Sequence, residues 1–240
     1  MQAHLQREIE HLKRQILVLS AEVENDVRSA VRAVENRDIV LAESVVKREI
    51  QTNAMEVDVE EECLKILALY QPVASDLRYI IAVLKINSDL ERIGDLAVHI
   101  AERGLFLGAY PSVDIPARLG IMADKAQAML KKVLDAFVNL NEQAAREVCA
   151  ADNEIDEINM EIFQQVKASV TQNPELFEPL LQIMHIARHL ERIADHATNI
   201  AEDLIYLIEG QIVRHTAEVS DKAMIGQTTP PLAQLSKDQT

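Results

Sequence analysis

The stretch INSDLERIGDLAVHIAE, from Ile86 to Glu102, decides the fold because it has a second copy, IARHLERIADHATNIAE, from Ile186 to Glu202. The copies agree at ten of seventeen positions and start one hundred residues apart. A repeat of this length indicates a duplicated structural unit. Both copies keep two acids four residues apart, namely Glu91 with Asp95 and Glu191 with Asp195. On a helix, residues four apart lie on one face.

The distribution of helix breakers predicts an all-α fold. Residues 1–71, 121–173 and 180–209 contain neither Gly nor Pro, and apolar residues from Leu5 onward recur every three or four positions. This spacing is typical of a packed helix. We therefore expect two tandem three-helix bundles, with helices over residues 4–35, 38–70, 75–108, 117–147, 151–172 and 175–209.

The expected domain boundaries follow from composition. Residues 1–110 form the first unit and residues 111–210 the second, with the linker at 104–117, where two Gly and two Pro occur. Residues 211–240 lose the apolar period, and we expect a mobile tail there.

Charge and hydropathy exclude several functions. The net charge is −15, which argues against nucleic-acid binding, because phosphate contacts need clustered Lys and Arg. No run of eighteen apolar residues is present, so any membrane role goes through partners. The charged start, MQAHLQREIEHLKRQ, is unlike a signal peptide, and Cys63 and Cys149 lack zinc or CxxC spacing. We expect a cytoplasmic protein with reduced thiols.

The shared acids lie on an unusual face of their helices. Glu91 and Asp95 extend an apolar stripe, where carboxylates are costly unless they are paired or bind a cation. The opposite arc is expected to face solvent, and it carries Arg78, Lys85, Asp89, Arg92 and Arg103.

The middle helix of each unit offers a similar pair, Asp152 with Asp156 in the second unit and Glu49 with Asn53 in the first. Hard cations such as iron, manganese or magnesium prefer oxygen ligands, and two facing acid pairs can hold more than one ion. Zinc also binds carboxylates. Because Asn53 is neutral, we expect three carboxylates in the first site and weaker binding there.

Other interpretations remain open. The acids can instead form structural ion pairs, for example with Arg188 or Arg192, in a metal-free helical scaffold. A ferritin-like di-iron protein would need a Glu-x-x-His motif on each of two helices, and only Glu8 to His11 fits. His99 is expected to be a hydrogen-bonded surface histidine, with a role as a further ligand as the alternative, and His196 is expected to face solvent. No glycine-rich loop or Arg cluster that would cradle phosphate is apparent.

Three motifs together resemble the PhoU family, accessory regulators of bacterial phosphate uptake: DLERIGD, its echo HLERIAD, and PVASDLR at Pro72 to Arg78. The resemblance spans residues 4–210. It implies a non-enzymatic, usually dimeric protein that restrains the phosphate-specific ABC transporter and reports its state to a sensor histidine kinase.

The resemblance also implies multinuclear metal clusters at the acid pairs, and no organic cofactor. The family's acid motifs map onto Glu91 with Asp95, Glu191 with Asp195, Asp152 with Asp156, and Glu49 with Asn53. In the PVASDLR segment, Asp76 is expected to cap the following helix, and Asp76 with Arg78 is a candidate partner-binding surface.

Overall fold

The computed structural model describes residues 2–110 and 113–210. Six long helices make up this part of the chain: α1 (Gln2–Asn36), α2 (Ile39–Tyr70), α3 (Ala74–Gly108), α4 (Ala117–Asn139), α5 (Glu142–Gln172) and α6 (Phe177–Glu209). A short 3-10 turn, Pro174–Leu176, precedes α6. The described residues contain no strand, as the sequence predicts. The expected tail at 211–240 lies outside the described residues.

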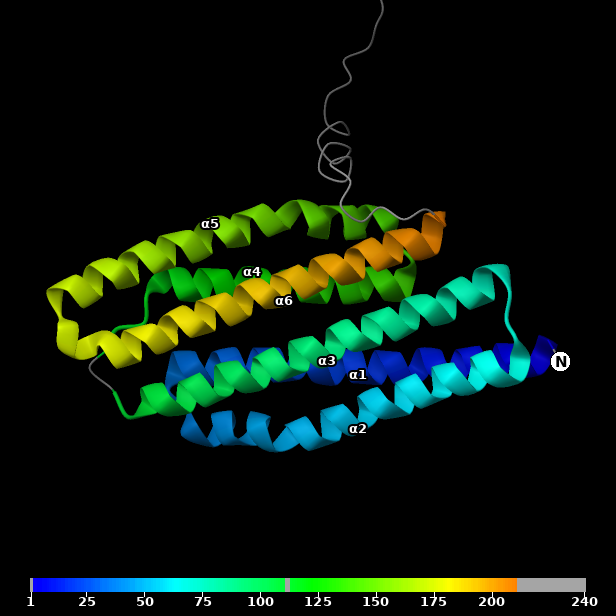
Figure 1. Ribbon diagram of the computed structural model, residues 1–240, viewed down its shortest axis with the longest axis horizontal. Coiled ribbons are helices and arrows are strands. Elements are labelled where there is room, and N and C mark those ends of the chain that lie inside the picture. The colour runs from blue at the N-terminus through cyan, green and yellow to red at the C-terminus, as the bar shows by residue number, and fades with distance from the viewer. Residues whose placement is uncertain (1, 111–112, 211–240) are drawn as a thin grey trace, which may run out of the picture.

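The helices form two three-helix units that lie side by side (Figure 1). Helices α1, α2 and α3 contact one another, as do α4, α5 and α6, and the units meet where α3 packs on α6 and α1 on α4. Buried apolar side chains from all six helices form one continuous cluster. None of the described helices is both long and apolar enough to cross a membrane.

The break between the fourth and fifth helices differs from the prediction, which ended the fourth helix at residue 147 and began the fifth at residue 151. The structure ends α4 at Asn139 and starts α5 at Glu142. Leu140 adopts a left-handed conformation (φ 48°), and the Asn141 side chain accepts a hydrogen bond from the backbone N–H of Ala144 at 3.1 Å. An N-cap therefore separates two helices without Gly or Pro. Asp38 caps α2 in the same way, bonding to Leu41 N at 2.9 Å.

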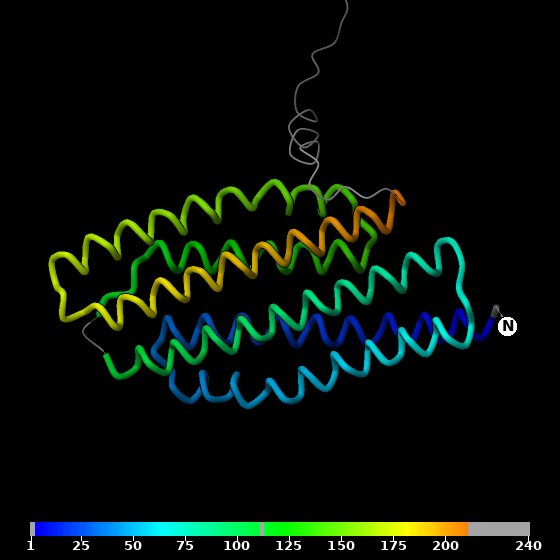
Figure 2. Tube along the Cα trace, viewed as in Figure 1, coloured from blue at the N-terminus to red at the C-terminus, as the bar shows by residue number. Residues whose placement is uncertain are grey.

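Part of the charged arc of α3 packs against α6, whereas the prediction placed the whole arc in solvent; Arg92 is exposed as expected. Lys85 Nζ lies 3.0 Å from Asp203 Oδ1 on α6, and Asp89 Oδ1 lies 2.8 Å from His196 Nδ1. Helix α3 runs antiparallel to α6 (Figure 2), so its residue numbers rise as those on α6 fall. A helix at the junction of two bundles has two buried faces, and its second face here is largely polar.

Arg37 connects the α1–α2 turn to the end of α3 and to the linker between the two units. It lies in the α1–α2 turn with φ 52°. Its guanidinium donates hydrogen bonds to the carbonyl oxygens of Leu107 (2.8 Å), Tyr110 (3.1 Å) and Val113. These carbonyls end α3 and begin the linker, where backbone acceptors lack helical partners. Nothing in the sequence pattern singles out this residue.

Candidate functional site

Four predicted carboxylates come together between α5 and α6. Burial first, and then the neighbouring charges of Asp195 and Asp156, raise the pKa of Asp152 to about 6. The pKa of Asp195 is raised by burial and by Asp156, and that of Glu191 by burial and by Asp195. Carboxylates that raise one another's pKa repel, so the cluster favours a proton or a cation between them.

Countercharges act on two of these four acids from a distance, since Arg188 partly offsets the raised pKa of Glu191, and His196 with Arg192 partly offsets that of Asp195. Within residues 2–110 and 113–210, none of the four forms an ion pair with Lys or Arg. Oδ1 of Asp152 is buried without a hydrogen-bond partner. An unpaired buried oxygen in an all-oxygen donor set fits a hard cation chemically.

The side chains are not arranged as a closed metal site. Among the described residues, no group of three or more His, Cys, Asp or Glu side chains is positioned to hold one ion. Binding would therefore require the carboxylates to turn toward a common point. The donor set fits a metal, whereas its present geometry does not define one.

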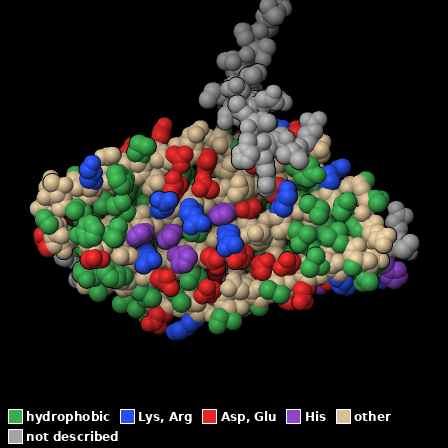
Figure 3. Space-filling model, in the orientation of Figure 1, with side chains coloured by type: hydrophobic (Ala, Val, Ile, Leu, Met, Phe, Trp, Pro, Cys, Tyr) green, Lys and Arg blue, Asp and Glu red, His purple; other side chains and the backbone are tan. Residues whose placement is uncertain are grey.

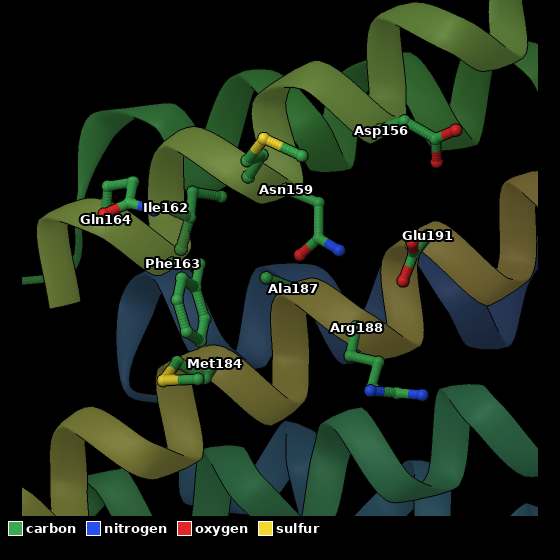
Figure 4. Close-up of a pocket in the computed structure, with 10 residues that line it drawn as sticks. Asp156, Asn159, Ile162, Phe163, Gln164, Met184, Ala187, Arg188 and Glu191 are labelled. Carbon is green, nitrogen blue, oxygen red and sulfur yellow. The ribbon is translucent and has the colours of Figure 1, made fainter. Parts of the chain in front are cut away.

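A groove opens beside this cluster. It has a volume of about 610 Å³, and Figure 4 shows Asp156 on α5 and Glu191 on α6 on its two sides. Its other end is apolar, with Met160 68% exposed and Phe163 45% exposed. The groove thus joins a negatively charged end to an apolar end, which suits contact with another molecule.

The first unit has a further acid, Glu56, that the prediction did not include. Burial and the charges of Glu60 and Glu91 raise the pKa of Glu56, so Glu56 lies near Glu91. Burial and then Asp95 raise the pKa of Glu91 itself. Glu56 was missed, although it lies seven residues, or two helical turns, after Glu49 on the same face.

The two units exchange an acid for an amide. With an offset of 103 residues, which also relates the two helix caps, Glu49 corresponds to Asp152, Asn53 to Asp156 and Glu56 to Asn159. Each middle helix thus carries two carboxylates and one amide. The number of carboxylates therefore no longer makes the first site the weaker one.

An ion pair does form in the first unit. Arg92 lies 3.2 Å from Glu91 and 4.0 Å from Asp95. In this unit the acids therefore form the kind of structural ion pair that was the alternative to metal binding. Arg92 is exposed, with 58% of its side-chain surface accessible. Exposed pairs of this kind contribute little to stability.

Several single-residue predictions need correction. Asp76 does not cap α3, because Val73 holds the N-cap position. Asp76 lies within the first turn, where its negative charge interacts favourably with the positive end of the helix dipole. His196 is not solvated but lies against Asp89. Arg78 lies beside Gly210 at the end of α6. Glu8, from the lone Glu-x-x-His motif, pairs with Lys65 at 2.9 Å.

His99 is exposed, as expected for a surface histidine, but it also contacts the second unit. Its ring lies 5.4 Å from that of His189 on α6, so it faces the junction between the units. The sequence shows no sign of this contact, because His189 lies ninety residues away.

Comparison with known proteins identifies relatives along most of the chain. The model of the PhoU domain matches twice, at residues 16–104 and 119–204. A "Phosphate-specific transport system accessory protein PhoU homolog" from Pseudomonas putida is 37% identical over 226 residues, covering 90% of this chain and 88% of the relative. A protein of the same description from Aquifex aeolicus is 36% identical over 209 residues, covering 87% and 95%.

Solved structures agree with the fold. The crystal structure of PhoU from Pseudomonas aeruginosa matches with a TM-score of 0.84 at 36% identity, covering 86% of this chain and 99% of that one. The phosphate transport system regulatory protein PhoU from Streptococcus pneumoniae gives a TM-score of 0.80 at 29% identity, covering 87% and 99%. Two domain matches, close relatives over most of their length and the same six-helix fold show that this chain belongs to the PhoU family.

Proposed function

We propose that this protein restrains phosphate uptake by contacting the phosphate-specific ABC transporter, and represses the phosphate-starvation response through a sensor histidine kinase. The observation that carries the proposal is membership of a family whose relatives are named as accessory proteins of phosphate-specific transport. The protein would act by contact rather than by catalysis, on the cytoplasmic side of the membrane.

Exposed apolar surface supports a role in contact. Ile50, Val57 and Leu64 recur every seven residues on α2 and are 80%, 47% and 53% exposed. Residues seven apart share one helix face, so they form an apolar stripe of the kind that protein partners cover. We assign this stripe to a homodimer contact, and the α5–α6 groove to the transport machinery.

We further propose that the paired acids bind hard metal ions, with iron, manganese, magnesium and zinc as candidates. A bound cation would offset the repulsion that raises the pKa of these carboxylates. In the second unit, Asp152 and Asp156 would hold it from α5, and Glu191 and Asp195 from α6. In the first unit, Glu49, Glu56, Glu91 and Asp95 would do the same for α2 and α3.

The regulatory proposal is tested in cells. Deletion of the protein should derepress phosphate-starvation genes in phosphate-rich medium, measured by a reporter for one such gene. Re-expression of the natural chain should restore repression. A variant with Glu91, Asp95, Glu191 and Asp195 replaced by Ala should restore it incompletely. Normal repression in the deletion strain would overturn the proposed function.

A matched control separates the acid sites from general loss of charge. Glu61 and Glu157 are exposed acids on α2 and α5, and replacing both with Ala should leave repression intact. Metal analysis of protein purified without chelator, with thermal melts of both variants, then distinguishes lost metal from lost folding. Absence of metal from the natural chain would remove the metal proposal and leave the regulatory one standing.

A further inference from the structure

Six positively charged or titratable side chains meet on the face between α3 and α6, in a chain of net charge −15. We call this group the seam patch; its members are His99, Arg103, His185, Arg188, His189 and Arg192. Figure 3 shows Lys, Arg and His side chains gathered in the middle of this face, with acidic side chains around them. The Arg cluster that no sequence motif indicated is therefore assembled by folding.

The members of the seam patch are close to one another. The ring of His189 lies 5.4 Å from that of His99 and 6.5 Å from that of His185, measured between centroids. The pKa of His189 is lowered to about 4, first by burial and then by His99, Arg103, His185 and Arg192. Figure 4 shows Arg188 extending from α6 away from α5 and toward α3.

The seam patch has acids nearby, because Arg188 partly offsets the raised pKa of Glu191 and Arg192 partly offsets that of Asp195, but neither acid is within ion-pair distance of it. In the part of the chain that the structure describes, none of its six side chains forms a hydrogen bond or an ion pair. Both ring nitrogens of His189 and Nε of Arg103 are buried without a partner. Buried polar groups normally have partners, and unpaired ones are costly.

The internal repeat shows that the seam patch lacks an acid that is present at the equivalent position in the other half of the seam. The hundred-residue offset between the copies pairs Lys85 with His185 and Asp203 with Arg103. Lys85 and Asp203 form an ion pair at 3.0 Å across the seam, whereas the equivalent positions hold two basic side chains. One half of the seam therefore contains an acid where the other half has Arg103.

A second position repeats the exchange. Asp89 accepts from Asn199 at 3.3 Å and lies 2.8 Å from His196. The same offset places His189 at the position of Asp89 and His99 at that of Asn199. The two carboxylates that neutralise one half of the seam are thus replaced by Arg103 and His189 in the other half.

We propose that the seam patch binds a phosphate-type oxyanion, which takes the place of the two missing carboxylates. The planar guanidinium groups of Arg188 and Arg192 are on the exposed side of α6 and match the oxygens of such an anion. The bound anion would join α3 to α6 and hence the first unit to the second. This proposal assigns a ligand that the proposed function does not include.

A transition metal is the alternative occupant, since three imidazoles lie near one another. Three arginines in the same patch would repel a divalent cation, and no described group of ligands is positioned to hold one. The charge of the patch therefore favours an anion.

The binding test uses histidine signals. Imidazole carbon–proton resonances of the full chain, freed of metal, are followed by NMR during titration with inorganic phosphate at constant ionic strength. We expect signals of His99, His185 and His189 to shift in a saturable way, while His4 and His11 on α1 do not. A parallel titration with glycerol 3-phosphate tests the source of the phosphate group. If the site accepts a phosphate that carries an organic substituent, glycerol 3-phosphate also binds; if the site takes only free phosphate, it does not.

Two variants test the residues. Arg188→Gln with Arg192→Gln should weaken binding by about tenfold or more, as loss of a charge-assisted hydrogen bond would. Arg103→Asp restores the acid found at the equivalent position and should abolish phosphate binding while keeping the fold. Arg32→Gln with Lys167→Gln removes the same charge as the double variant from exposed sites elsewhere and should bind normally.

Three outcomes would overturn the proposal. These are absence of a saturable shift with either phosphate compound, equal weakening in the Arg32 and Lys167 control, and saturation of the same histidines by Zn²⁺ but not by phosphate. Loss of this proposal would leave gene repression in cells untouched, so its failure is distinguishable from failure of the proposed function.

Discussion

At the residue scale, the acids are placed where their charges are costly. The pKa of Asp152 is raised the most among these acids, because the group is partly buried and is repelled by the charges of both Asp195 and Asp156. Helical spacing alone predicted which residues pair within a helix. It did not predict the strength of the repulsion, because that depends on how closely α5 approaches α6.

A pH-dependent stability follows for Asp152. Its ordinary pKa is 3.8 and its folded value about 6, so between these pH values the folded state binds more protons than the unfolded state. The contribution of this group to stability is therefore present at low pH and is lost as pH rises through 6. We expect Asp152→Asn to raise the free energy of unfolding by about 1 kcal/mol at pH 7.5, since solvent screens the half-exposed group.

The measurement is urea unfolding of metal-free protein at pH 4.5 and pH 7.5. The gain from Asp152→Asn should nearly vanish at the lower pH. Glu157→Gln, an exposed acid on the same helix, should show little change at either value. An equal gain at both pH values would mean that the substitution acts through something other than the charge.

The predicted part of the site was the part that lies within one helix. Residues at i and i+4 share a face whatever surrounds them, so Glu91 with Asp95 and Glu191 with Asp195 were found. Glu56 was missed because its role depends on the approach of α2 to α3. The charged arc of α3 was partly misinterpreted. An amphipathic pattern separates an apolar face from a polar face, but it does not show that a second helix, here α6, packs against part of the polar face.

At the element scale, most helices were predicted from breakers and apolar period, and the exception is instructive. The break at Leu140 depends on a left-handed residue that is not Gly and on the Asn141 side chain. Such a cap is visible only when its hydrogen bond forms. By contrast, Pro72 and Pro174 restrict the residue before them and mark boundaries in any context.

Two glycines within α3 give a matched test of helix packing. A Cβ on Gly94 would lie 3.7 Å from Thr52 Cγ2, an ordinary contact, whereas one on Gly104 would lie 3.1 Å from Val34 Cγ2 on α1. Ala is favoured over Gly in a helix by about 0.5–1 kcal/mol. We expect Gly94→Ala to raise the melting temperature and Gly104→Ala to lower it or leave it unchanged.

Thermal melts of the two variants, followed by circular dichroism, check this expectation. The gain in helix propensity is common to both, so their difference isolates the approach of α3 to α1. Equal stabilisation by both substitutions would show that α1 adjusts to the extra methyl group, and that Gly104 is not required for close packing.

At the scale of the whole molecule, the two duplicated units share one hydrophobic core. The sequence predicted two bundles, and the same pattern would suit two independent domains joined by a linker. The buried apolar cluster instead continues through all six helices. The Lys85–Asp203 pair adds a polar link, with only 2% of the Asp203 side chain exposed.

We therefore predict that the described part of the chain unfolds in a single cooperative transition. Independent domains unfold in separate steps, whereas a shared core couples them. Replacing Lys85 with Ala removes a partner of the buried Asp203 carboxylate and should cost about 1–3 kcal/mol. Because the shared core remains, the variant should melt earlier but still in one step.

Calorimetry of the full chain and of Lys85→Ala provides the test, by comparing the calorimetric with the van't Hoff enthalpy. Lys47→Ala removes an exposed pair with Glu43 and should change stability by no more than about 1 kcal/mol. Two resolved transitions in the natural chain would show that the units fold separately. In that case the seam would be a contact between domains, and a ligand bound there would tune their association rather than stabilise one folded body.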